Sequence, residues 1–175
     1  QKMGIAKILD QVIQPHGNRK GLSVGEIVPL WLSYILSEGD HRMVMVEDWI
    51  GSRLILFSDL IGKPIRPKDF TDDRLAGVLE KLADNEVWET VETKLGQHML
   101  QVYKLAGTDA IVIRLDSTSV SGHHQITEDG LFQFGYSKDH RPDLAQYKLM
   151  LATLDPLGMP VASLIVSGEK SDDGL

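Results

Sequence analysis

Residues 111–119 read Ile111-Val112-Ile113-Arg114-Leu115-Asp116-Ser117-Thr118-Ser119. β-branched residues dominate this run, which predicts a strand, because such side chains pack well on a pleated sheet. Glycines lie on both sides of it, at Gly107 and Gly122. The apolar part stops at Asp116, a poor strand former, so we predict a strand that ends in a carboxylate. From the residues alone Asp116 has two possible roles, a hydrogen-bonding cap at a strand end or a functional acid.

Two further strands are predicted downstream. Residues 145–154 are apolar and β-compatible, and residues 161–166 follow after the turn sequence Asp155-Pro156-Leu157-Gly158. Asp, Pro and Gly are typical of a tight turn, so the two segments are predicted to form a hairpin.

The first hundred or so residues have helical rather than strand periodicity. Ser23 and Glu26 match a capping box at the start of a helix, and Thr71 stands where it would cap a later one. The predicted helical segments are 4–13, 23–36, 43–60 with a break near Gly51, 72–83 and 86–103. We therefore predict an α+β chain, with a helical domain over residues 1–106 and a β-rich domain over residues 107–175.

The composition excludes several classes of function. The net charge is −7, the wrong sign for a protein that binds nucleic acid by neutralising phosphates on its own. Residues before Gly107 hold 13 basic and 15 acidic side chains, and the rest of the chain holds 5 and 10. There is no cysteine, which excludes disulfides and thiolate metal sites. No apolar stretch reaches the ~20 residues of a membrane span, so we expect a cytoplasmic chain that does not cross a membrane.

Three stretches resemble bacterial insertion-sequence transposases of the Asp-Asp-Glu (DDE) class, in the branch with a helical N-terminal domain. They are Leu115-Asp116-Ser117-Thr118, Gly135-Tyr136-Ser137-Lys138-Asp139-His140-Arg141-Pro142-Asp143-Leu144 and Leu154-Asp155-Pro156-Leu157-Gly158-Met159-Pro160. Residues 16–23 and 68–75 add to the resemblance, which covers nearly the whole chain. Such long matched stretches are more specific than a single short motif.

The resemblance implies that residues 107–175 are the first three antiparallel strands of an incomplete ribonuclease H-like domain. It implies that Asp116 is the first catalytic acid and a ligand of Mg²⁺ or Mn²⁺. The second Asp and the Glu of that class would lie beyond Leu175. The implied partner is DNA, as transposon ends and target. An incomplete three-strand sheet would leave one face and an edge uncovered, so we also expect the chain to associate with further copies of itself.

Lys138, His140 and Arg141 are the candidate DNA-binding residues. They are concentrated in one loop and could contact the phosphates of transposon ends, which fixes position rather than sequence. The alternative is a self-paired loop, because Asp139 and Asp143 lie among them and exposed ion pairs are common.

A transition-metal site is a less favoured alternative for the histidines of this region. It would join His123 and His124 to Asp116 and His140. Adjacent residues on a strand point to opposite faces, so two adjacent histidines are not expected to share one ion.

Two classes of function follow. The first is the N-terminal part of a DDE transposase, which binds transposon-end DNA and, when complete, cleaves and joins DNA strands during transposition and recombination. Residues 1–175 alone are then expected to be inactive, because later carboxylates are missing. The second is a non-enzymatic module for dimerisation or DNA-end binding, or a truncated inactive transposase.

Overall fold

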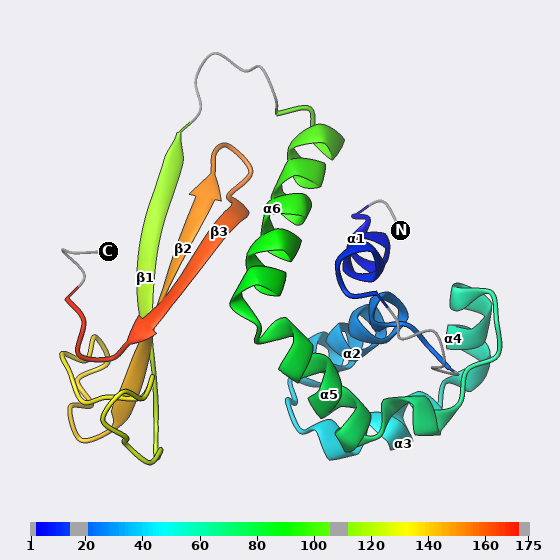
Figure 1. The fold of residues 1–175 in the computed structure, drawn as a ribbon, viewed down its shortest axis with the longest axis horizontal. Helices are drawn as coiled ribbons and strands as arrows, with labels where there is room; N and C mark the ends of the chain where they lie inside the picture. Colours follow the sequence, from blue (N-terminus) through cyan, green and yellow to red (C-terminus); the bar gives the residue numbers. More distant parts are fainter. Residues whose placement is uncertain (1–2, 15–20, 106–111, 172–175) are drawn as a thin grey trace. The chain divides into compact units, whose positions relative to one another are not determined.

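The computed structural model describes residues 3–14, 21–105 and 112–171. The chain separates into two compact units, Gln1–Lys104 and Leu105–Leu175. The predicted division was at residues 106 and 107, and residues 106–111 lie outside the described part, as do residues 15–20 and 172–175. The first unit is helical and the second carries a sheet (Figure 1).

Six α-helices and two 3₁₀ helices make up the described part of the first unit. In chain order they are α1 (Ile5–Val12), α2 (Val24–Glu38), η1 (Met43–Met45), α3 (Val46–Gly51), α4 (Leu54–Ile61), η2 (Pro67–Phe70), α5 (Asp72–Leu82) and α6 (Asn85–Val102). The break predicted near Gly51 separates α3 from α4. Helix α2 runs through Pro29 without ending there.

Helix α2 begins with the predicted capping box. The Ser23 hydroxyl accepts from the N–H of Glu26 at 3.2 Å, and the Glu26 carboxylate accepts from the N–H of Ser23 at 2.8 Å. A second carboxylate, that of Asp10 in α1, accepts from the Ser23 hydroxyl and from the N–H of Gly25, both at 2.8 Å. Residue 25 must be glycine because a Cβ there would lie 2.0 Å from the carbonyl oxygen of Ala6.

One apolar core holds the helices of this unit together. Its most deeply buried side chains are Ile27, Val46, Ile50, Phe70, Leu75, Val78 and Val91. Asp69 is buried beside them and accepts hydrogen bonds from Arg66 and Arg74, at 2.9 and 2.6 Å to Oδ1. Thr71 is the N-cap residue of α5, as predicted, although its side chain makes no capping hydrogen bond.

The second unit contains three strands, β1 (Ile113–Gly122), β2 (Ala145–Leu154) and β3 (Met159–Ser167). They form one antiparallel sheet in the order β1-β2-β3. The predicted α+β class, with helices followed by three antiparallel strands, is confirmed. A register shift between Ala152 and Thr153 interrupts the pairing of β2 with β3.

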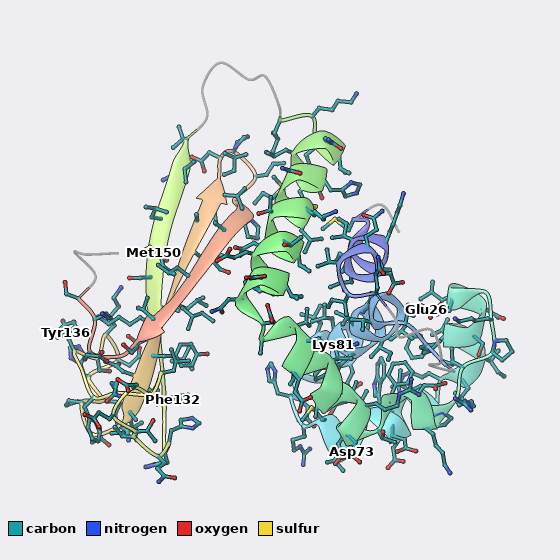
Figure 2. All side chains as sticks on the ribbon, in the orientation of Figure 1. Glu26, Asp73, Lys81, Phe132, Tyr136 and Met150 are labelled. Carbon is teal, nitrogen blue, oxygen red and sulfur yellow. The ribbon has the colours of Figure 1, made fainter. Side chains whose placement is uncertain are left out.

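The connection from β1 to β2 is long and lies at one end of the sheet, where Figure 2 shows Phe132 and Tyr136. Gln133 in this connection pairs with Gln146 of β2 through two backbone hydrogen bonds of 3.0 Å. The loop therefore returns to the sheet before the turn that carries the candidate cations. None of the helices in the described part of the chain combines the length and apolar character needed to cross a bilayer.

Candidate functional site

Asp116 is the fourth residue of β1 and pairs with Leu151 of β2. Its side chain is exposed, and Oδ1 accepts a hydrogen bond from the N–H of Ser117 at 2.9 Å. The prediction that the strand ends at Asp116 is wrong, because β1 continues to Gly122, which pairs with Ala145. Pairing across the sheet outweighs the low strand propensity of an aspartate.

β1 is an outer strand in the described sheet, with β2 on one side. Peptide groups of an antiparallel strand point alternately to the partner strand and away from it. The carbonyl of Val112 accepts from the N–H of Asp155, on the β2 side. Ser117 is an odd number of residues further on, so its N–H and carbonyl point to the outer edge.

Side chains satisfy both of these edge groups. Asp116 accepts from the N–H of Ser117, and Nζ of Lys138 donates to the Ser117 carbonyl at 2.7 Å and to its Oγ at 2.6 Å. Lys138 comes from the connection, 21 residues later in the chain. We call Asp116, Ser117 and Lys138 the Ser117 edge. It brings a carboxylate and an ammonium group to the same residue, and charged groups also protect an exposed strand edge from pairing with other chains.

The turn after Lys138 holds the other two predicted cations. Arg141 donates to both carboxylate oxygens of Asp143, from Nε at 2.8 Å and from Nη2 at 2.7 Å. These hydrogen bonds lower the pKa of Asp143 to about 2, with a smaller contribution from the charge of His123. The same pair raises the pKa of Arg141. The guanidinium of Arg141 is thus directed at Asp143 rather than at Asp116.

His140 is exposed on this turn, in the left-handed backbone region with φ 56°. Its N–H donates to the carbonyl of Ser137 at 3.2 Å, which closes the turn that carries Lys138. His124 stacks on Phe132, with ring centroids 3.7 Å apart. The described residues hold no group of three His, Asp or Glu side chains placed to bind one metal ion.

The segment before Lys138 is anchored to the sheet by a buried amide. Nε2 of Gln146, a fully buried residue of β2, donates to the carbonyl of Tyr136 at 2.8 Å. Two glycines let the backbones meet there. A Cβ at Gly135 would lie 2.1 Å from the carbonyl oxygen of Gly168, and one at Gly168 would lie 2.2 Å from that of Gln146. This close packing fixes the loop from which Lys138 reaches Ser117.

Sequence reasoning missed several of these residues. Gln146 and Lys148 alternate along β2 and are both buried, and Lys148 pairs with Ser119 across the sheet. Polar side chains at alternate positions of an otherwise apolar strand are the signal that could have found them. The close approaches at Gly135 and Gly168 could not be predicted from neighbouring residues, because they join segments far apart in the chain.

Comparison with known proteins gives one match. Residues 1–98 match the family described as "Domain of unknown function (DUF4277)". No curated protein and no solved structure matches the chain. The matched region takes in all six α-helices of the first unit, apart from the end of α6. Since it spans more than half of the 175 residues, the chain belongs to the DUF4277 family.

Proposed function

We propose that the chain is the N-terminal part of a bacterial insertion-sequence transposase of the DDE class. It would bind transposon-end DNA, and the complete protein would cleave and join DNA strands. The observation that carries the proposal is the Ser117 edge, where exposed Asp116 and Lys138 contact the same residue. Both residues come from stretches that resemble this family.

The sheet supports the proposal through its topology. A ribonuclease H-like domain opens with three antiparallel strands, the first of which carries the first catalytic acid. Here β1, β2 and β3 are antiparallel neighbours in chain order, and Asp116 lies on β1. Three strands by themselves fit many folds, so the position of the acid is the more specific part of this support.

Asp116 suits a metal ligand. It is exposed, and the N–H of Ser117 accounts for one of its two oxygens. Mg²⁺ and Mn²⁺ prefer such carboxylate oxygens, and bound divalent ions would activate the attacking group and stabilise the leaving oxygen of a phosphodiester. The described residues supply no complete set of ligands, so we propose that the remaining carboxylates come from sequence after Leu175.

Lys138 is the strongest of the three candidate DNA contacts. Its amine lies at the same edge as Asp116, so a phosphate placed for cleavage would come near it. Arg141 pairs with Asp143 and Lys138 donates to Ser117, so a phosphate would have to compete with an existing partner at either residue; what favours Lys138 is its place beside Asp116 at the Ser117 edge. His140 is exposed on the turn between them. We therefore propose Lys138 as the principal phosphate contact, with His140 and Arg141 in supporting positions.

A strand-cleavage assay tests the proposed activity. The substrates are duplexes copied from the sequences that flank the coding region, incubated with the complete protein and Mg²⁺ or Mn²⁺. We expect nicks at one fixed position in each end, removed by EDTA, and no nicking by residues 1–175 alone. A complete protein that binds these duplexes but never cuts them with either metal would contradict the proposal.

A further inference from the structure

Helix α4 is apolar on nearly every side. Six of its eight residues are apolar, in the sequence LILFSDLI. Leu54, Phe57 and Ile61 pack against the core of the helical unit. The others point away from it: Ile55, Leu56 and Leu60 are 81%, 62% and 60% exposed. A helix that is apolar all round is ordinarily covered on all sides, so these three residues, the α4 face, are expected to meet another surface.

α4 is fixed against α2 at both ends. Nζ of Lys63, just after α4, lies 2.7 Å from Oε1 of Glu26 near the start of α2. Nη2 of Arg53, just before α4, lies 3.8 Å from Oε1 of Glu38 at the end of α2. The two helices therefore run antiparallel, with Glu26 between them (Figure 2). These ion pairs link α4 to α2, and the packing of Leu54, Phe57 and Ile61 on the core holds the helix in place.

The apolar surface extends beyond α4. A groove of about 500 Å³ lies between α2, the start of α1 and the end of α4, and its lining includes Ile5, Pro29 and Leu60. Leu36 is two turns after Pro29 on α2, hence on the same side of that helix, and it is also exposed. Monomeric soluble proteins rarely expose several large apolar side chains together, and where they do the surface is ordinarily an interaction site.

We propose that two copies of this chain associate through the α4 face, with their α4 helices antiparallel about a two-fold axis near Leu56. Such an interface must be self-complementary. Arg53 is three residues before Leu56 and Asp59 is three residues after it, so this alignment sets each Arg53 opposite Asp59 of the other copy. Within its own chain the Arg53 guanidinium lies over the Trp49 ring and donates from Nη1 to the Trp49 carbonyl, so the pair with Asp59 would be added to these contacts. Asp59 is exposed and has no hydrogen bond or ion pair within the described part of the chain.

The positions of Arg53 and Asp59, equally far from Leu56 and opposite in charge, are the reason for proposing a second copy of this chain as the partner. Leu56 meets Leu56 at the centre, Leu60 of each copy lies near Ile55 of the other, and an Arg53–Asp59 pair closes each end. An apolar centre with a polar rim is the usual anatomy of a specific interface. The inference stands apart from the proposed function, because it uses only the helical unit.

Cysteine cross-linking tests the position of the axis. The chain has no cysteine, so Leu56→Cys carries a single thiol. Two such thiols meet across the axis, within the Cα separation of about 7 Å that a disulfide allows. Under mild oxidation we expect Leu56→Cys to form a covalent dimer rapidly. The control is Leu79→Cys, an exposed position on α5, which should remain a monomer. Equal rates for the two variants would overturn the proposal.

Sedimentation equilibrium tests the interface on the full 175 residues. We expect a wild-type dimer, and a dissociation constant raised more than about tenfold by Leu56→Asp. Leu164→Asp, at an exposed position on β3, should leave it unchanged. Asp59→Arg should weaken association, and adding Arg53→Asp to it should restore association by swapping the charges. Circular dichroism verifies that each variant is folded. A wild-type monomer, or a dimer lost in Leu164→Asp but kept in Leu56→Asp, would overturn the proposal.

Discussion

Nζ of Lys138 lies 2.7 Å from the carbonyl oxygen of Ser117, a residue 21 positions earlier in the chain. The contact joins the turn that holds Lys138, His140 and Arg141 to β1, the strand that carries Asp116. It also places a cation where a phosphate held near Asp116 would need one. The proposed chemistry therefore depends on a loop and a strand that fold together, rather than on either alone.

Lys138→Ala should weaken DNA binding for every duplex sequence tested, because a phosphate contact carries no base information. The slope of log binding constant against log salt concentration should become shallower by about 0.9, as expected for one lost contact. Fluorescence anisotropy over a salt series measures it. Lys170→Ala is the matched control, since it removes one exposed lysine of the same unit. Identical slopes for the two variants would show that Lys138 does not contact a phosphate.

Arg141→Ala should raise the pKa of Asp143, because hydrogen bonds from Arg141 are the main cause of its low value of about 2. The pair contributes stability above the ordinary aspartate pKa of about 3.9, and this contribution is lost as pH falls toward 2. An NMR titration of the Asp143 carboxyl carbon should give a midpoint near 2 in the wild type and near 4 in the variant. Arg114→Ala is the control, since it removes the partner of Asp155 instead. An unmoved Asp143 midpoint in Arg141→Ala would contradict the pairing.

Local signals predicted much of the fold. The capping box depends on Ser23 and Glu26, three residues apart, and α3 ends at Gly51, which the polar residues Ser52 and Arg53 follow; both signals lie within one or two turns of chain. The three strands were predicted for the same reason, since β-branched and apolar runs with turn residues between them are local patterns.

Long-range contacts decided the features that were not predicted. β1 passes through Asp116 because Ser117 to Gly122 find partners in β2, and no local pattern encodes that pairing. Asp10 caps α2 from a different helix, and the Lys138 contact with Ser117 spans the whole connection. The sequence therefore predicted which residues belong to the candidate site, but it did not predict the contacts that bring them together.

Gly25→Ala should destabilise the helical unit by about 2 kcal/mol, because its Cβ would collide with the backbone of Ala6 where α1 crosses α2. Gly77→Ala, in α5, is the control: a Cβ there meets nothing within 4 Å. That change should stabilise the unit by about 0.5–1 kcal/mol, the usual gain for alanine over glycine in a helix. Urea unfolding followed by circular dichroism gives both free energies. A destabilisation that is equal in the two variants would show that the crossing is not as close as described.

The assignment of Asp116 as the catalytic acid is tested most directly by strand cleavage with the Asp116→Asn variant of the complete protein. The assay uses its own flanking duplexes in Mg²⁺, with binding to the same duplexes measured in parallel. Asparagine keeps the shape of the side chain and removes its charge. Asp129→Asn, at an exposed position in the connection, is the matched control. We predict that Asp116→Asn nearly abolishes cleavage while binding stays close to wild type, and that Asp129→Asn keeps both. Normal cleavage by Asp116→Asn would contradict the assignment.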